Sequence, residues 1–288
     1  MSSAMTKPVP LRDLAELAER YDHFFVDQFG VLHEGSAAYP GAIEALSKLK
    51  ASGKSVVLLS NSGKRSAPNE ERLAGLGFAR GSWDIFLSSG EVAWRRFAGL
   101  ADQPGLDAGT RCLLIARDGD RSAVEGLAIE LVDDAARAEV ILLAASEGDR
   151  FDLDHYRRLL APAATAGVPC LCTNPDRIML TKSGPRFGAG RIAELYEELG
   201  GTVEWIGKPH PAIYEAALER LGDPPRQRVV GIGDSVEHDI AGAAGAGLSS
   251  ALVRSGILAG MSGPELDEMF ARHGARPDFI LPGFVWQA

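Results

Sequence analysis

The chain has 288 residues, of which 45% are apolar and 24% are charged, and its net charge is −9. The length fits one large domain or two moderate ones, and the composition is typical of a globular protein with a sizeable core. The negative charge argues against a nucleic-acid partner, which needs a basic face, although local groups can still bind a small anion.

The first part of the chain alternates amphipathic helices with apolar strands. Helical spacing of apolar residues predicts helices over residues 11–21, 40–53 and 66–77, and apolar runs predict buried strands over 23–29 and 55–60. This alternation is typical of a parallel sheet with helices on both faces.

The same alternation returns late in the chain. The predicted elements are a helix at 190–199, a strand at 203–207, a helix at 210–222, a strand at 228–234, a helix at 236–246 and a strand at 249–253. We therefore predict an α/β fold with a Rossmann-like, doubly wound parallel sheet as its core.

The middle of the chain forms a segment of its own. It contains apolar strands at 111–116, 139–145 and 169–174 and a helix around 152–166. We expect an inserted α/β domain over residues 88–187, with residues 1–87 and 188–288 forming the core.

Polar residues stand where the predicted core strands end, which is where open parallel sheets bind ligands. These residues are Asp27, the run Ser60-Asn61-Ser62, Lys208, Asp234 and Asp239. Carboxylates, hydroxyls and an ammonium at one rim suit phosphoryl transfer. A carboxylate can attack phosphorus, a hard cation such as Mg²⁺ takes carboxylate oxygens, and a lysine can stabilise the phosphoryl oxygens.

Several motifs together resemble the haloacid dehalogenase superfamily, in its class IIA branch (NagD-like and p-nitrophenylphosphatase-like). They are FVDQFGVLHEG, LLSNS, GKPHPAIYEAAL, GIGDSVEHDIAGAAGAG, TNPD at 173–176 and FGAG at 187–190. The resemblance covers nearly the whole chain and implies a Mg²⁺-dependent phosphatase. Its inserted domain would be a cap of the C2 type that selects a small phosphorylated metabolite.

The resemblance also implies roles for single residues. Asp27 would be the nucleophile and a metal ligand, together with the backbone carbonyl of Phe29 and the carboxylate of Asp234. Asp239 would orient Lys208 or a metal-bound water, and Lys208 would hold the phosphoryl group opposite the substrate-binding residues Ser60, Asn61 and Ser62. Asn174 and Asp176 would bind substrate near the junction of cap and core.

Phe29 departs from the family pattern, which usually has an aspartate there as general acid. Loss of such a group typically costs about 10²–10⁴ in rate. Three explanations are open: the substrate has a good leaving group, His33 or Glu34 supplies the proton, or hydrolysis is slow and the protein mainly binds a phosphorylated metabolite.

A metal-independent dehalogenase also tolerates an aromatic residue at position 29. The acidic pair in GDSVEHD and the position of the insertion argue against that reading.

The remaining features concern the cellular setting. Three cysteines without framework spacing, Cys112, Cys170 and Cys172, indicate a reducing compartment, and we expect a cytoplasmic protein with buried thiols. The N-terminus lacks a basic segment followed by an apolar run, and no apolar run approaches a membrane span, so we expect neither a secretory leader nor a membrane anchor. A homodimer is plausible.

Overall fold

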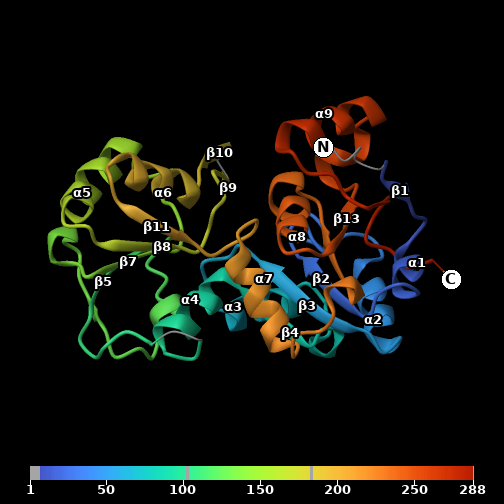
Figure 1. Ribbon diagram of the computed structural model, residues 1–288, viewed down its shortest axis with the longest axis horizontal. Coiled ribbons are helices and arrows are strands. Elements are labelled where there is room, and N and C mark those ends of the chain that lie inside the picture. The colour runs from blue at the N-terminus through green and yellow to red at the C-terminus, as the bar shows by residue number, and fades with distance from the viewer. Residues whose placement is uncertain (1–6, 102–103, 182–183, 288) are drawn as a thin grey trace. The chain divides into compact units, whose positions relative to one another are not determined.

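The computed structural model describes residues 7–101, 104–181 and 184–287. They form two compact units (Figure 1). The chain passes between the units at four places: from Ser60 to Asn61, around residues 69–70, around residues 87–88, and from Gly207 to Lys208. The first unit holds the chain up to Ser60, the segment 70–87 and the chain from Lys208 on, and the second holds 61–69 and 88–207.

The first unit is built on a seven-stranded sheet in the order β1-β14-β13-β12-β2-β3-β4. Its strands are Val9–Pro10 (β1), His23–Asp27 (β2), Ser55–Ser60 (β3), Ile85–Ser88 (β4), Val229–Gly233 (β12), Ser249–Val253 (β13) and Phe279–Leu281 (β14). Each pairing from β1 through to β3 is parallel. β12 is buried along its whole length, as a strand covered on both faces must be.

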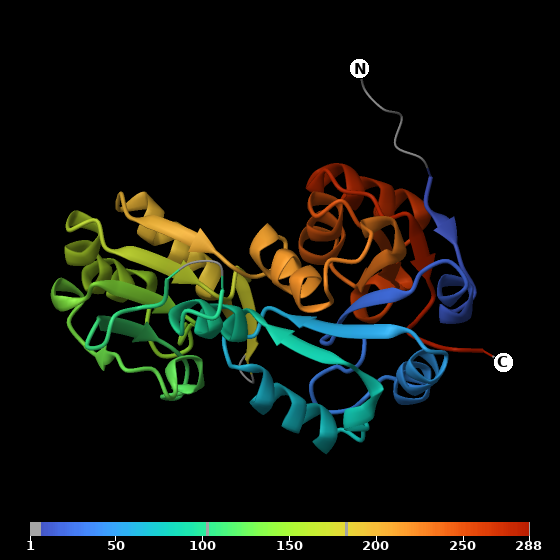
Figure 2. The same cartoon turned by 60° about the horizontal axis from the view of Figure 1, so that its bottom comes forward.

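Helices cover both faces of this sheet (Figure 2). They are Leu14–Ala18 (α1), Ala42–Ala51 (α2), Ser66–Gly75 (α3, which begins in the second unit), Pro211–Arg220 (α7), Ala241–Gly245 (α8) and Gly263–His273 (α9). Apolar residues of α1, α2 and α3 pack in one cluster with Phe24, Val26 and Ile232, while those of α9 pack with Leu252. The predicted doubly wound α/β core is confirmed.

The second unit has its own five-stranded parallel sheet in the order β11-β8-β7-β5-β6. Its strands are Arg111–Ile115 (β5), Glu130–Leu131 (β6), Val140–Leu143 (β7), Pro169–Cys172 (β8) and Thr202–Trp205 (β11), and its helices are Ser89–Phe97 (α4), Leu153–Thr165 (α5) and Ala189–Glu198 (α6). The antiparallel hairpin Ile178–Thr181 (β9) and Gly184–Phe187 (β10) stands apart from this sheet.

The structure corrects two expectations. The second unit ends at Gly207 rather than at residue 187, because β11 pairs with β8 and α6 packs with α5. The helix expected over 236–246 is instead a π-helical turn, Val236–Ile240, followed by the short α8. The first difference concerns the segment just before Lys208, and the second concerns the turn that carries Asp239.

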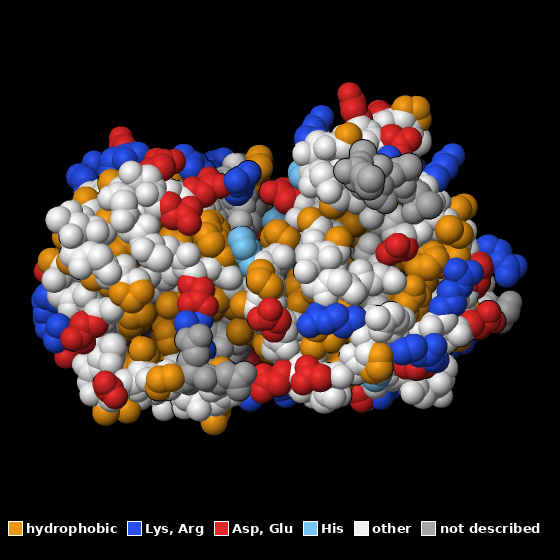
Figure 3. Space-filling model, in the orientation of Figure 1, with side chains coloured by type: hydrophobic (Ala, Val, Ile, Leu, Met, Phe, Trp, Pro, Cys, Tyr) orange, Lys and Arg blue, Asp and Glu red, His pale blue; other side chains and the backbone are white. Residues whose placement is uncertain are grey.

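Three expectations from the composition concern the surface charge, membrane-spanning helices and the cysteines. On the face shown in Figure 3, Lys and Arg side chains are interspersed with Asp and Glu. Within the described ranges, no helix is long and apolar enough to cross a membrane. The three cysteines are buried, and burial raises the pKa of each thiol.

Candidate active site

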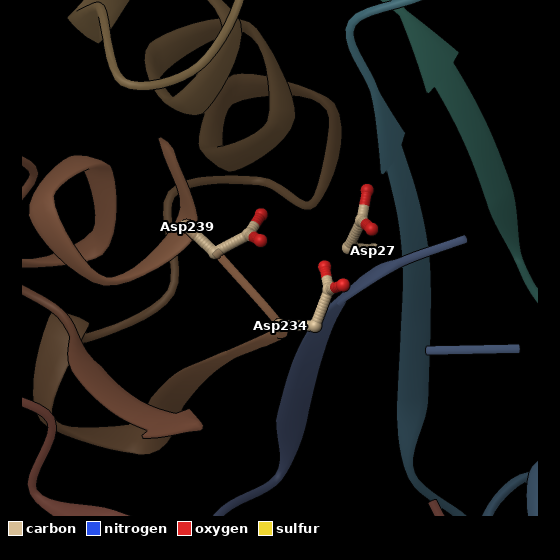
Figure 4. Close-up of side chains that lie close together, drawn as sticks. All are labelled: Asp27, Asp234 and Asp239. Carbon is tan, nitrogen blue, oxygen red and sulfur yellow. The ribbon is translucent and has the colours of Figure 1, made fainter. Parts of the chain in front are cut away.

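Two acids meet because the strands that carry them are neighbours. Asp27 is the last residue of β2, Asp234 follows β12 directly, and β2 and β12 are adjacent parallel strands. Their carboxyl ends therefore lie at the same edge of the sheet. Asp239 joins them from the π-helical turn (Figure 4), and one carboxylate oxygen from each of the three lies within 4.8 Å of the others.

Lys208 links two of these acids. Its Nζ donates hydrogen bonds of 2.6 Å to Asp27 Oδ1 and of 2.6 Å to Asp239 Oδ1, and the residue is only 4% exposed. Charge-assisted bonds of this length are among the stronger ones in proteins. The structure thus brings together four of the residues that the sequence singled out.

Two glycines make room for this cluster. Gly30 has a φ of +87°, and a Cβ built on it would lie 2.0 Å from Asp234 Oδ2. A Cβ on Gly233 would lie 2.0 Å from Asp239 Cγ. Any side chain at either position would push a carboxylate out of the cluster.

Burial and the charges of neighbouring groups shift the pKa values of the residues in this cluster. Burial raises the pKa of Asp234 to about 7, and the charge of Asp239 adds to the effect while Lys208 opposes it. Burial also raises the pKa of Asp27. Burial alone would lower the pKa of Lys208, but the charges of Asp239 and Asp27 outweigh it, so the lysine stays protonated.

The cluster fits a hard divalent cation. Three carboxylates against one ammonium leave two excess negative charges when all four groups are ionised, in a site that is largely buried. Carboxylate oxygens are the ligands that Mg²⁺ and Ca²⁺ take, and a bound cation would offset that excess. Burial is the main cause of the raised pKa values of Asp27 and Asp234, and the neighbouring carboxylates add to it.

Ser60 lies beside this cluster in the sheet. It ends β3, one residue beyond Leu59, which is the partner of Asp27 in the β2–β3 register. The Gln28 side chain donates from Nε2 to Ser60 Oγ at 2.5 Å, and both residues are buried. Gln28 therefore fixes the serine that the sequence singled out for phosphate binding.

Phe29 has no transferable proton, and the side chain of His33 packs against it. The ring of His33 is 1% exposed and packs edge-on against Phe29, and its Nδ1 accepts the Gly35 N–H at 3.0 Å. Burial, with the charge of Arg72, lowers the pKa of His33 to about 4, so the ring is neutral at neutral pH. Glu34, the other candidate, is exposed and accepts from Ser36 Oγ.

The other predicted substrate-binding residues lie in the second unit. Asn61 Nδ2 donates to Asp176 Oδ1 at 2.9 Å, and the Asp176 N–H donates to Asn174 Oδ1 at 3.1 Å. Ser62 Oγ accepts from the Lys64 N–H at 3.3 Å. Asn61, Asn174 and Asp176 thus form one hydrogen-bonded group, while Ser62 belongs to the turn before α3.

The last residue of the second unit's long segment lies at this group. A Cβ on Gly207 would lie 2.4 Å from Pro175 Cδ and 2.7 Å from Asn61 Oδ1. Gly207 is the last residue before Lys208, and Asn61 is the first after Ser60. Two of the four chain crossings between the units therefore start from one place in the second unit.

Sequence reasoning missed the residues that make the cluster possible. Gln28, Gly30 and Gly233 carry no chemistry of their own, so a search for reactive groups passes over them. Their position was the signal, since Gln28 and Gly233 are next to an acid at a strand end and Gly30 is three residues beyond one.

Gly30→Ala should abolish divalent-metal binding while leaving the fold intact. The methyl group occupies the place of the Asp234 carboxylate, and the backbone strain at positive φ costs about 1–2 kcal/mol. Calorimetric titration with Mg²⁺ measures the loss. Gly53→Ala is the matched control, because Gly53 has a φ of +80° and no atom within 4 Å of its built Cβ. Equal Mg²⁺ affinity in both variants would contradict the prediction.

The metal-free protein should lose stability as the pH rises from about 4 to about 7. The Asp234 carboxyl has a higher pKa in the folded protein than in the unfolded chain, where it releases its proton near pH 3.8. Between these two pKa values the folded protein still holds a proton that the unfolded chain has lost, so raising the pH favours unfolding. The loss is on the order of 4 kcal/mol for Asp234. Thermal unfolding in EDTA between pH 4 and pH 8 measures it. Asp234→Asn should flatten the profile, and a wild-type profile already flat would argue against the raised pKa.

Comparison with known proteins agrees with this geometry. The sequence profile of the haloacid dehalogenase-like hydrolase family matches residues 24–130, and a second profile, described as HAD-hydrolase-like, matches 205–285. The sugar-phosphatase AraL of Bacillus subtilis is 30% identical over 235 residues, which are 80% of this chain and 82% of that protein.

Two solved structures are similar over most of the chain. The p-nitrophenyl phosphatase of Archaeoglobus fulgidus has a TM-score of 0.73 and 28% identity, covering 92% of this chain and 97% of that one. The glycerol phosphate phosphatase of Mycobacterium tuberculosis, solved in complex with calcium, has a TM-score of 0.66 and 26% identity, covering 84% and 68%. The chain belongs to the haloacid dehalogenase-like hydrolases, in their class IIA branch, and is a phosphatase of that family.

Proposed function

We propose that the protein hydrolyses a small organic phosphomonoester in a magnesium-dependent reaction, through an aspartyl phosphate on Asp27. The observation that carries this proposal is the buried cluster of Asp27, Asp234 and Asp239 around Lys208. The relatives support the substrate class, because they include a sugar phosphatase, a nitrophenyl phosphatase and a glycerol phosphate phosphatase.

Asp27, Asp234 and the backbone carbonyl of Phe29 would hold the metal. The Asp234 carboxylate lies against Gly30, whose peptide nitrogen follows the Phe29 carbonyl. When bound, Mg²⁺ would offset the negative charge and allow an anionic carboxylate to approach an anionic phosphate. A relative crystallised with calcium, a cation with the same preference for oxygen ligands, supports a divalent ion in this family.

Asp27 would carry the phosphoryl group. Lys208 binds Oδ1, which leaves Oδ2 to form the bond to phosphorus while the ester oxygen departs with its electron pair. Water then attacks phosphorus, releases phosphate and restores the carboxylate. Lys208, oriented by Asp239, stabilises the phosphoryl oxygens in both steps, together with Ser60, Asn61 and Ser62.

The ester oxygen would leave without a proton from residue 29. Phe29 has no transferable proton, and His33 is neutral with its Nδ1 engaged by the Gly35 N–H. Esters whose leaving group is stable as an anion, such as aryl phosphates, are therefore favoured over alkyl phosphates.

The second unit would act as the cap that selects the substrate, with Asn174 and Asp176 among its contacts. Its insertion into the chain after Ser60 and its return before Lys208 support this role. A homodimer and a cytoplasmic location stay predictions from the sequence.

Removal of the metal or of the nucleophile should abolish phosphate release. EDTA should stop turnover of p-nitrophenyl phosphate, Mg²⁺ should restore it, and Asp27→Asn should lower kcat more than about 1000-fold. Asp223→Asn, an exposed acid in the turn after α7, is the matched control. Undiminished turnover in Asp27→Asn would overturn the proposal, and binding of phosphate esters without any turnover would instead support a binding protein.

Turnover should depend steeply on the acidity of the leaving group. Across a series of phosphates from nitrophenols to simple phenols and alcohols, kcat/KM of the wild type should fall as the leaving group becomes more basic. Phe29→Asp should flatten this dependence and speed the poorest substrates about 10²–10⁴-fold. Phe29 is 47% exposed, so an acid there is compatible with folding.

Phe29→Leu controls for loss of the ring and should keep the steep dependence. A wild type that hydrolyses alkyl and nitrophenyl phosphates at equal rates would show that another residue supplies the proton.

A further inference from the structure

Asp239 is carried by an uncommon backbone turn. Its Oδ1 accepts from Lys208 and its Oδ2 accepts the Ser235 N–H at 3.1 Å. The backbone around it is π-helical, with the Ile240 N–H donating to the Ser235 carbonyl at 3.1 Å, five residues back. Such turns are rare and occur frequently at functional sites. The contact between Asp239 and Lys208 therefore depends on the conformation of this turn.

Tyr214 supplies a contact to this turn from another element. It lies on α7, is 1% exposed, and its hydroxyl is 3.5 Å from the His238 carbonyl oxygen and 3.4 Å from that of Asp239. Burial, reinforced by the charge of Asp239, raises the pKa of this phenol, so the group keeps its proton and acts as a donor. The bonds are long, and the single proton serves both carbonyl groups.

Gly242 allows Tyr214 to come this close. A Cβ on Gly242, in α8, would lie 2.5 Å from the Tyr214 hydroxyl oxygen and 2.6 Å from its Cε2. The ring is thus held against the helix that directly continues the π-helical turn. Gly242 is the first residue of the small-residue stretch GAAGAG at 242–247, and the close approach of the Tyr214 ring explains why a glycine stands there.

The same ring borders the reactive groups. Tyr214 lines a cavity of about 10 Å³, roughly the size of one water, together with Asp27, Lys208 and Asp239. It therefore touches the backbone that carries Asp239 and also lies beside the ammonium to which Asp239 binds.

We propose that Tyr214 is a positioning residue for phosphoryl transfer, which fixes the π-helical turn so that Asp239 stays against Lys208. This inference rests on the proposed roles of Lys208 and Asp239. A tyrosine that only filled the core would be replaced by phenylalanine without any effect on turnover, because the two rings have the same shape.

Tyr214→Phe should lower kcat for p-nitrophenyl phosphate about 3- to 10-fold, as expected for one weak hydrogen bond, with KM unchanged. Gly242→Ala displaces the same ring from α8 and should also lower kcat without raising KM. It serves as the second variant if Tyr214→Phe folds poorly. Tyr196→Phe is the matched control, because Tyr196 is equally buried and its hydroxyl donates to the Val168 carbonyl at 2.6 Å in the second unit. It should lower the unfolding temperature and leave kcat unchanged.

A double-mutant cycle identifies the route of the effect. If Tyr214 acts through Asp239, then Tyr214→Phe should cause no further loss in an Asp239→Asn background. An equal loss in both backgrounds, or wild-type kcat in Tyr214→Phe while Asp239→Asn is impaired, would overturn the inference and leave the proposed function intact. Wild-type turnover in Asp239→Asn and Asp27→Asn would overturn both.

Discussion

The site depends on one buried ammonium placed between carboxylates. Lys208 binds Asp27 and Asp239 at 2.6 Å each, while Asp234 adds a third negative charge to the same space. Charges removed from water are costly unless they are paired. The surroundings reflect this cost: Gly30 and Gly233 leave room for the carboxylates, and a π-helical turn brings Asp239 back towards the lysine. Because positive charge is still in deficit, the cluster gains by taking up a cation.

The sheet places two of these acids directly, while Lys208 and Asp239 come from turns. β2 and β12 are parallel neighbours, so the acid that ends one and the acid that follows the other share an edge. Lys208 precedes α7, and Tyr214 on α7 contacts the backbone of the turn that holds Asp239. The lysine and the tyrosine that contacts the backbone of its anionic partner thus lie close in sequence, in the turn before α7 and in α7 itself.

Much of this arrangement could be predicted from the sequence, for a physical reason. Apolar runs and helical spacing identify strands and helices, and parallel strands bring their terminal acids together. The border of the inserted unit was placed too early because periodicity does not tell which sheet a strand such as β11 joins. Likewise, the state of His33 depends on burial by residues distant in sequence. The π-helical turn was predicted as an ordinary helix because its five residues are too few for their spacing to distinguish an i→i+5 turn from an α-helix.

The contact between Asn61 and Gly207 has a consequence for how such proteins can evolve. The long inserted segment, residues 88–207, begins and ends beside one short stretch of the chain, because the Gly90 N–H donates to the Ser62 carbonyl at 3.0 Å and Gly207 lies against Asn61. A module with adjoining ends can be exchanged by recombination without altering the spacing of the strands it interrupts. Lineages that keep the acid-bearing sheet could therefore acquire new specificities by grafting a different insert, while the catalytic groups stay in place.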